Sequence, residues 1–251
     1  MTSDSEPTKA TARPPASAEV LGRVVTARGR WLDEAVEVLS DNPLAAGVWL
    51  VGSLGRADGD GFSDVDLIVA IEGPVPAALR THPFGGLGLP GTVLFVRPKP
   101  RNAPDGGAFL SVCLEMAGLP VLVDMYLWPS ITVAVPTGSR VLMERGRMPR
   151  SKLGLLDLLA LCPPTDTSGS DPDDPATLLL LVQLAAKYHA RGDRSRRAAI
   201  CNQLNIPDIT IVEQLRHLLD DRLPTLWPAS TAARTAVDRL FELVSTLGEG
   251  R

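Results

Sequence analysis

The sequence predicts an α/β domain followed by a helical domain. In the N-terminal part, short apolar runs alternate with helical periodicity and are separated by Gly- and Pro-rich turns, which is typical of buried strands and helices. From residue 176 onward the apolar residues recur at helical spacing. We therefore expect one domain over residues 18–161 and a second over residues 176–251.

Composition marks both boundaries of the first domain. Residues 162–175 are rich in Asp and Pro and contain no aliphatic residue, as expected of an exposed linker. Residues 1–17 are rich in Pro, Ser, Thr and Ala, which is typical of a disordered tail.

The elements follow from local periodicity and turn signals. In the first domain we expect helices over 20–39 and 108–117, and strands over 46–51, 65–71, 92–97 and 119–127. We also expect a loop with a short helix at 73–91, and a closing pair at 131–135 and 140–144. Gly118 is a good stop for the helix over 108–117. The second domain is expected to hold helices over 176–191, 194–204, 208–222 and 229–247.

Composition excludes several classes of protein. The net charge of −4 over 251 residues gives no global basic field for nucleic acid. No apolar run approaches membrane-spanning length, and the N-terminus lacks the apolar core of a signal peptide. The three cysteines, Cys113, Cys162 and Cys201, have neither metal nor redox spacing, so we expect a reducing cytoplasm.

Two aspartates stand at the mouth of an apolar strand in "VWLVGSLGRADGDGFSDVDLIVAI", residues 48–71. Because strand residues alternate between faces, Asp64 and Asp66 are expected to point toward one spot. Like charges so close repel and raise at least one pKa unless a cation lies between them. Hard oxygen ligands suit Mg²⁺, and two such ions can clamp the oxygens of a phosphoryl displacement.

The turn before these aspartates has the chemistry of a phosphate site. Gly52 allows a tight turn and a close approach of phosphate. Ser53 offers a hydroxyl donor, and the amides after it open toward an anion. Arg56 can add a charge-assisted hydrogen bond to the same phosphates.

A third carboxylate, Asp124, lies inside the apolar run "LPVLVDMYLWP". An unpaired buried carboxylate is unfavourable. A metal ion, or an acceptor hydroxyl that Asp124 deprotonates, would relieve this; a structural pairing with an arginine is the alternative.

The stretch "GSLGRADGDGFSDVD", residues 52–66, resembles the DNA polymerase β-type nucleotidyltransferase superfamily. It is most similar to the aminoglycoside (kanamycin-type) nucleotidyltransferases. The resemblance implies an α/β (α+β) nucleotidyltransferase domain with a mixed sheet, followed by a C-terminal helical domain. It also implies two Mg²⁺ ions held by carboxylates, and transfer of a nucleoside monophosphate from a triphosphate with release of pyrophosphate. The matching residues are Gly52, Ser53, Asp64, Asp66 and Asp124.

The resemblance also implies a base and a lysine on the first C-terminal helix. Kanamycin nucleotidyltransferase has a glutamate base one turn before a phosphate-binding lysine. In "LVQLAAKYHARGD", residues 181–193, Lys187 matches the lysine, and Gln183 stands where the glutamate is expected. Because glutamine cannot accept the proton, the alignment is shifted, Asp124 is the base, or the acceptor is not an aminoglycoside. The basic residues over 187–197 suit a triphosphate or an anionic acceptor.

The leading hypothesis is an enzyme that transfers AMP from ATP to a hydroxyl of a small molecule, with an antibiotic as the family's usual acceptor. A toxin–antitoxin type nucleotidyltransferase that modifies tRNA or a protein is an alternative. The basic segment favours it, whereas the net charge and the sizeable C-terminal domain disfavour it. A non-catalytic nucleotide sensor is a third hypothesis, suggested by the missing glutamate. The oligomeric state stays open.

Overall fold

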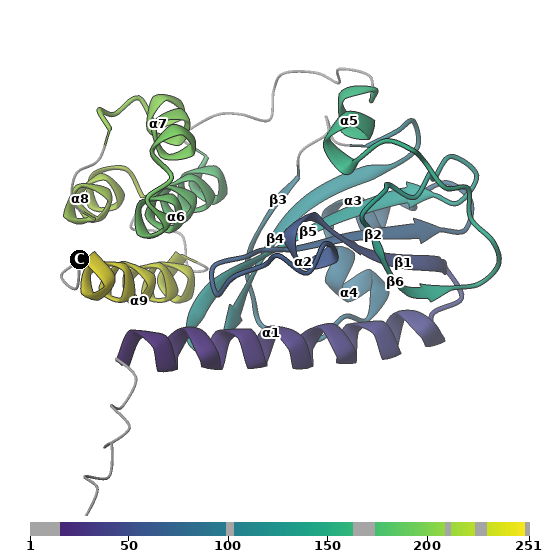
Figure 1. Ribbon diagram of the computed structural model, residues 1–251, viewed down its shortest axis with the longest axis horizontal. Helices are drawn as coiled ribbons and strands as arrows, with labels where there is room; N and C mark the ends of the chain where they lie inside the picture. The colour runs from purple at the N-terminus through teal and green to yellow at the C-terminus, as the bar shows by residue number, and fades with distance from the viewer. Residues whose placement is uncertain (1–15, 99–102, 163–173, 209–211, 224–229, 249–251) are drawn as a thin grey trace, which may run out of the picture.

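The computed structural model describes residues 16–98, 103–162, 174–208, 212–223 and 230–248. It contains a sheet with helices around it and a separate group of helices formed by the C-terminal part of the chain (Figure 1). No helix within the described ranges is long and apolar enough to cross a membrane.

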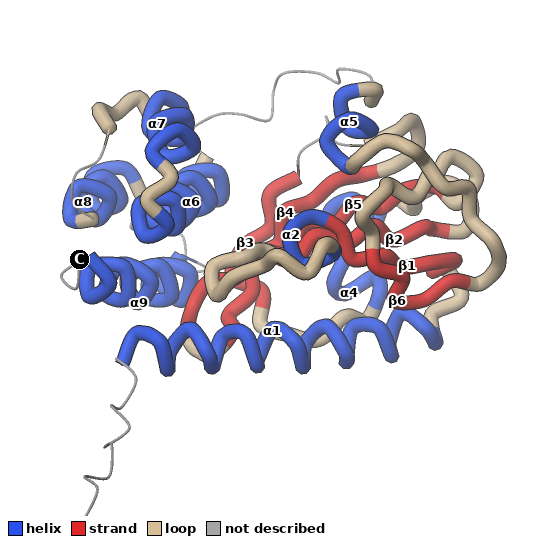
Figure 2. The backbone as a smooth tube through the Cα atoms, viewed as in Figure 1, coloured by secondary structure: helices blue, strands red, loops and turns tan. Residues whose placement is uncertain are grey.

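The sheet has six strands in the order β3-β4-β5-β2-β1-β6 (Figure 2). The strands are β1 (Ala45–Val51), β2 (Val65–Ile71), β3 (Val93–Pro98), β4 (Ala108–Met116), β5 (Leu119–Pro129) and β6 (Arg140–Glu144). Strands β2 and β5 pair in parallel, and every other neighbouring pair is antiparallel. The expected α/β fold with a mixed sheet and C-terminal helices is therefore confirmed.

The helices in chain order are α1 (Ala16–Asp41), α2 (Gly52–Gly55), α3 (Ala77–Thr81), α4 (Pro83–Leu87), α5 (Leu155–Ala160), α6 (Pro175–Arg191), α7 (Arg194–Gln203), α8 (Glu213–Arg222) and α9 (Ser230–Gly248). The sequence sets the ends of α6 clearly. The Asp174 side chain accepts a hydrogen bond from the Thr177 amide at 2.8 Å, and Pro175 opens the first turn. At the other end Gly192 adopts a left-handed conformation, with φ 70°.

One face of the sheet packs on α1, α3 and α4. Val65, Leu67 and Val69 of β2 point to this face and belong to the same core cluster as Trp31 and Leu39 of α1. Figure 1 shows α1 running along the sheet and past α9. The same cluster of buried apolar residues continues into α6, α7, α8 and α9, so the sheet and the C-terminal helices share one continuous core.

The opposite face of the sheet is covered in two places. Between them lies a strip of polar residues, which we call the polar strip. At one end, β5 contributes Tyr126 and Trp128 to an apolar cluster that also contacts Leu155 and Leu159 of α5. At the other end, α6 packs over β4, where Gln183 contacts Cys113. The strip between α5 and α6 carries the candidate active site.

Three expectations about elements need correction. Residues 108–116 form strand β4 rather than a helix, because a run buried on both faces lacks the alternation that distinguishes a strand. The turn between β4 and β5 is Ala117 and Gly118, with φ of 51° and 82°, as a type I′ hairpin requires. Residues 140–144 form β6, but they pair with β1. Val135 makes only an isolated bridge, with Arg150.

The ends of two other expectations lie outside the described residues. Of the expected tail over 1–17, Ala16 and Ser17 already belong to α1, and residues 1–15 are not described. Of the expected linker over 162–175, residues 163–173 are not described, and Asp174 and Pro175 begin α6.

Candidate active site

Four polar residues lie opposite one another across four strands. Asp66 of β2 is paired with Asp124 of β5, Asp124 with Ser111 of β4, and Ser111 with Arg97 of β3. Because directly opposite residues point to the same face, these side chains form one line across the sheet, which we call the polar row. With strands about 4.8 Å apart, the row spans about 14 Å.

Asp66 lies directly beneath the glycine turn. Gly52 has φ 64°, and a Cβ atom there would overlap the Asp66 carboxylate, so only glycine fits this position. Burial raises the pKa of Asp66 well above its ordinary value. The charges of Asp124 and Asp64 raise it further, and Arg56 partly opposes them. The structure therefore brings Asp64, Asp66 and Asp124 within electrostatic range of one another.

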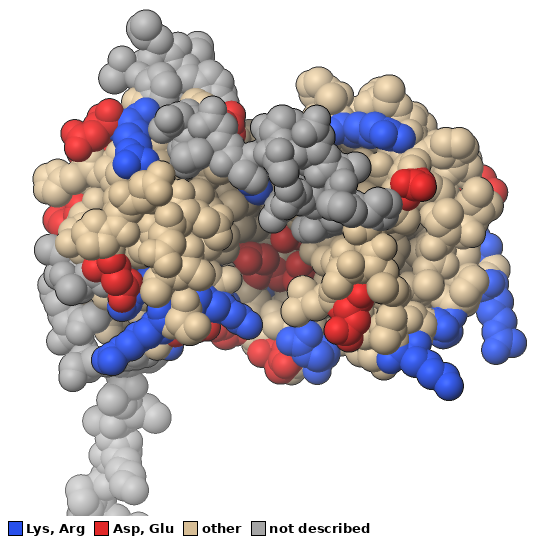
Figure 3. Space-filling view, turned by 90° about the horizontal axis from the view of Figure 1, so that it is seen from above, with Lys and Arg blue, Asp and Glu red and all other residues tan. Residues whose placement is uncertain are grey.

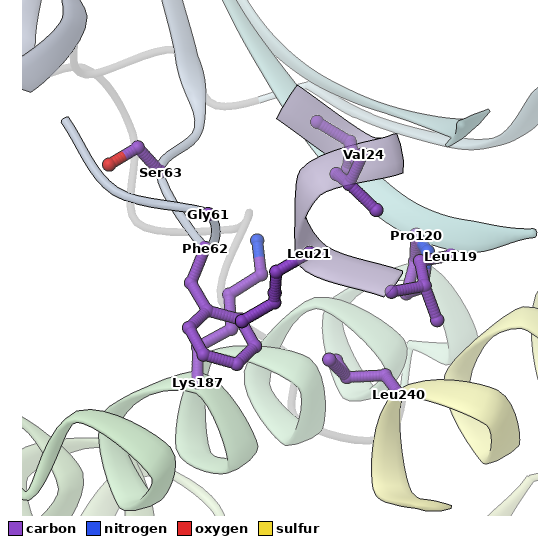
Figure 4. Close-up of a pocket in the computed structure, with 10 residues that line it drawn as sticks. Leu21, Val24, Gly61, Phe62, Ser63, Leu119, Pro120, Lys187 and Leu240 are labelled. Carbon is purple, nitrogen blue, oxygen red and sulfur yellow. The ribbon is translucent and has the colours of Figure 1, made fainter. Parts of the chain in front are cut away.

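Asp64 is held by the helical part of the chain. It lies one residue before β2, and the Lys187 ammonium donates a hydrogen bond to its Oδ1 at 2.5 Å. Lys187 is only 3% exposed. Figure 4 shows its side chain rising from α6 beside Phe62 and Leu21. The lysine expected to bind phosphate thus neutralises one of the three carboxylates.

The 60–64 loop, which carries Asp64, is fixed from two sides. Arg191, one turn after Lys187 on α6, donates two hydrogen bonds to Asp60, at 2.8 and 2.6 Å. This pairing lowers the pKa of Asp60 to about 2. Arg28 of α1, which is buried, donates to the Ser63 carbonyl at 2.6 Å. Helices α1 and α6 together therefore set the position of Asp64.

Gln183 is enclosed between α6 and β4. It is fully buried on α6, and its amide contacts the Cys113 thiol of β4 at 3.9 Å. Burial raises the pKa of Cys113 to about 12. A carboxylate at position 183 would be fully buried between helix and sheet, which gives a physical reason for the glutamine.

The two other predicted phosphate ligands flank Gly52. Ser53 is half-buried in α2, and its carbonyl accepts a hydrogen bond from the Asp58 amide at 3.0 Å. Arg56 is exposed and pairs with Asp58 at 3.1 Å, yet its charge still acts on Asp66. The charge of Arg56 therefore reaches the three aspartates, and an incoming phosphate would compete with Asp58 for Arg56.

The basic segment after Lys187 does not form a free cationic wall. Arg191 pairs with Asp60. The other pairs are Arg196 with Asp193 at 3.6 Å and Arg197 with Asp208 at 2.7 Å. Most of the positive charge expected to attract an anionic acceptor is thus neutralised within the chain.

Sequence reasoning missed two members of the polar row. Ser111 donates a hydrogen bond to Asp124 Oδ1 at 2.5 Å. Arg97 is buried, and its Nε donates to the Thr177 hydroxyl of α6 at 2.8 Å. Ser111 lay in a segment expected to be helical, and Arg97 ended a strand expected to lead into an exposed loop. Only the register of β3, β4 and β5 reveals that they adjoin Asp124.

The donor set of the acidic cluster suits a divalent cation. Within the described residues, no group of three or more His, Cys, Asp or Glu side chains is already arranged to hold a metal ion. Asp66 and Asp124 nevertheless offer hard oxygen donors side by side. Burial, and then the charges of Asp124 and Asp64, raise the pKa of Asp66, and a bound cation would offset the effect of those charges. Asp64 already accepts a hydrogen bond from Lys187 at Oδ1, so a cation would compete with Lys187 for its charge.

One face of the molecule is hollowed (Figure 3). Figure 3 shows acidic side chains gathered in a depression between the helical part of the chain and the sheet part. The small cavity drawn in Figure 4, beside Phe62 and Lys187, has a volume of about 10 Å³. It is a packing gap between α1, the 60–64 loop and α9, and is too small for a substrate.

No family model matches the sequence, and neither does any curated protein. Among solved structures, a Helicobacter pylori protein provisionally described as a nucleotidyltransferase matches with a TM-score of 0.28 and 14% identity, over 91% of this chain and 97% of its own. The Helicobacter pylori protein JHP933 matches with a TM-score of 0.28 and 14% identity, over 90% and 96%. Because a TM-score this low carries no argument, we interpret the site from its own residues.

Proposed function

We propose that the chain is a Mg²⁺-dependent nucleotidyltransferase that transfers AMP from ATP to a hydroxyl of a small molecule, with an antibiotic among the candidate acceptors. The observation that carries this proposal is the pairing of Asp66 and Asp124 on parallel strands directly beneath the Gly52 turn. Two adjacent carboxylates with a glycine turn above them supply a cation site next to a place where phosphate can approach the backbone.

Asp66 and Asp124 would hold Mg²⁺, and Asp124 has a second role in the transfer. The turn at Gly52 lets the triphosphate approach the backbone, and Ser53 and Arg56 donate hydrogen bonds to it. Bound Mg²⁺ would neutralise charge on the phosphates and orient them. The acceptor oxygen attacks the α-phosphorus, the bond to pyrophosphate breaks, and Asp124 accepts the hydroxyl proton. Gln183, buried against Cys113, takes no part in this transfer.

The direct test uses the full-length chain with each nucleoside triphosphate, Mg²⁺, and separate panels of antibiotics and tRNA. We expect pyrophosphate release that requires both Mg²⁺ and one small-molecule acceptor, and an acceptor heavier by one AMP. Asp66→Asn serves as the inactive control. Labelled tRNA with unmodified small molecules would instead support the toxin–antitoxin alternative.

A non-catalytic nucleotide sensor is the second candidate. The pairing of Lys187 with Asp64 favours it, because a site whose carboxylate is already neutralised can bind a nucleotide without activating it. Calorimetry separates the two candidates. Tight ATP binding without pyrophosphate release for any acceptor supports the sensor, whereas release contradicts it.

A further inference from the structure

Ser111 is the polar residue in an otherwise apolar stretch of β4. Its neighbours on the same face, Phe109 and Cys113, are buried and apolar. Ser111 itself is 4% exposed. A hydroxyl buried in such surroundings is unfavourable unless it is hydrogen-bonded. Its partner is the Asp124 carboxylate, directly opposite on β5.

The bond between these two residues has a defined direction and strength. An ionised carboxylate can only accept, so the Ser111 hydroxyl donates to Asp124 Oδ1. The distance of 2.5 Å lies in the range of charge-assisted O–H···O⁻ bonds, which are stronger than neutral ones. Both residues lie within paired strands, so the geometry rests on rigid elements. The bond therefore fixes how the plane of the Asp124 carboxylate is turned.

Arg97 of β3 lies directly opposite Ser111, on the side away from Asp124. Its guanidinium is buried and bonded to Thr177 in the first turn of α6. The order across the sheet is cation, hydroxyl donor, carboxylate, carboxylate. Ser111 thus lies between a fixed positive charge and the two acids of the cluster.

We propose that Ser111 is a positioning residue that orients Asp124 for metal binding. This inference rests on the proposed nucleotidyltransferase function. Ser111 touches neither metal nor substrate and acts through Asp124. Outer hydrogen-bond partners of metal-binding side chains typically contribute 10–100-fold to metal affinity or activity.

The test measures metal affinity directly, with Mn²⁺ as the probe and electron paramagnetic resonance as the readout, on the full-length chain without nucleotide. Ser111→Thr and Ser111→Val form a matched pair with nearly equal shape, and only the threonine keeps the hydroxyl. We expect Ser111→Thr to bind Mn²⁺ within about threefold of the wild type. Ser111→Val and Ser111→Ala should bind it about 10–100-fold more weakly. At saturating Mn²⁺ their pyrophosphate release should recover in part.

Val112→Ala is the control for a purely structural effect. Val112 is fully buried next to Ser111 but points to the opposite face of the sheet. Its truncation should lower the melting temperature and leave Mn²⁺ affinity unchanged. The inference is wrong if folded Ser111→Val binds Mn²⁺ as Ser111→Thr does, or if Val112→Ala weakens binding equally. If valine prevents folding, the comparison of Ser111→Ala with Ser111→Thr decides in the same way.

The outcome separates this inference from the proposed function. A wild type that binds Mn²⁺ and releases pyrophosphate, with unchanged affinity in the valine variant, overturns the role of Ser111 alone. A wild type that neither binds Mn²⁺ nor releases pyrophosphate overturns both, because Asp124 would then hold no metal for Ser111 to orient.

Discussion

At the residue scale, the carboxylate of Asp66 is unfavourable for folding but is required by the proposed metal site. Its carboxylate is buried beneath Gly52 and beside Asp124, and its pKa is raised. The folded chain therefore binds a proton at this group more tightly than the unfolded chain does. This proton binding adds to the free energy of unfolding below the ordinary Asp pKa of about 3.8. The addition is lost as the pH rises through the raised pKa of the folded state.

Asp66→Asn should therefore stabilise the metal-free protein at neutral pH while abolishing pyrophosphate release. We expect thermal melts in EDTA to shift upward by about 2–4 °C for each kcal/mol gained. The shift should be larger at pH 7.5 than at pH 4, because the cost of burying the wild-type carboxyl group grows as the pH rises above the ordinary pKa of Asp. Equal or lower melting temperatures at pH 7.5 would contradict the charge conflict at this residue.

Lys187 competes with a metal ion for Asp64. Its ammonium is buried against that carboxylate at 2.5 Å, so Lys187→Met should increase the negative potential of the acidic cluster. We expect Mn²⁺ to bind several-fold more tightly and ATP more weakly, both measured by calorimetry. Arg197→Met, which breaks the partly buried pair with Asp208, is the control and should change neither affinity. Weaker Mn²⁺ binding in Lys187→Met would show that the lysine supports the metal site rather than competing with it.

At the element scale, the β4–β5 hairpin turns through a residue poorly suited to its conformation. Ala117 has φ 51° and is exposed, and the left-handed region is unfavourable for alanine but tolerated by asparagine. Ala117→Asn should raise the free energy of unfolding by about 1 kcal/mol, measured by urea denaturation. Ala232→Asn, on the exposed side of α9, is the opposite control and should lower it. A loss of stability in Ala117→Asn would contradict the turn geometry.

Helix α6 presents one face to the sheet and to the 60–64 loop. Gln183, Lys187 and Arg191 follow one another at intervals of four residues and contact Cys113, Asp64 and Asp60, as side chains on one helical stripe do. This stripe both attaches α6 to β4 and fixes the loop that carries Asp64.

Gln183→Glu should destabilise the chain rather than supply a base. It places an acid in a fully buried contact with Cys113, at a cost of roughly 2–4 kcal/mol. Gln183→Met, similar in length and apolar, should cost much less. Chemical denaturation and pyrophosphate release of both variants check this. Increased activity in a fully stable Gln183→Glu protein would show that position 183 reaches the acceptor.

The sequence predicted the elements whose signal is local. Strands β1, β2, β3 and β5, helix α1 and helices α6 and α7 lie within a few residues of their expected positions, because periodicity, caps and turns define them. Strand β4 was mistaken for a helix, since its run is apolar on both faces. The same distinction holds at the site. Asp66 and Gly52 belong to one short motif and could be predicted together. The positions of Ser111 and Arg97 follow from strand register, and the pairing of Lys187 with Asp64 follows from which face of α6 meets the loop.

At the scale of the whole molecule, the candidate active site lies where the sheet meets the C-terminal helices. The polar row belongs to the sheet, and Lys187 and Thr177 belong to α6. The shared core holds these parts together, and the hollow of Figure 3 lies between them. Ligands that bridge the acidic cluster and α6 should therefore stabilise the entire fold.

We expect Mg²⁺ and a non-hydrolysable ATP analogue to raise the melting temperature together by more than the sum of their separate effects. At one hundred times the dissociation constant a ligand adds about 2.7 kcal/mol, which corresponds to about 5–10 °C at this chain length. Differential scanning calorimetry measures the shift. Asp66→Asn should lose the Mg²⁺-dependent part and keep any part due to nucleotide alone. Purely additive shifts in the wild type would mean that metal and nucleotide bind independently.

The parallel pairing of β2 with β5 also determines when β2 can pair with β5 during synthesis. Parallel strands cannot be joined by a tight turn. Strand β2 therefore leaves the ribosome before its partner β5, and it can pair with β5 only after α3, α4, β3 and β4 have been synthesised. Domains form from the N-terminus as synthesis proceeds, and such distant pairings form slowly. A nascent chain that ends before β5 therefore carries Asp66 without Asp124. Because Arg97 and Ser111 are made before Asp124, the groups that accommodate the second charge are already present when it arrives.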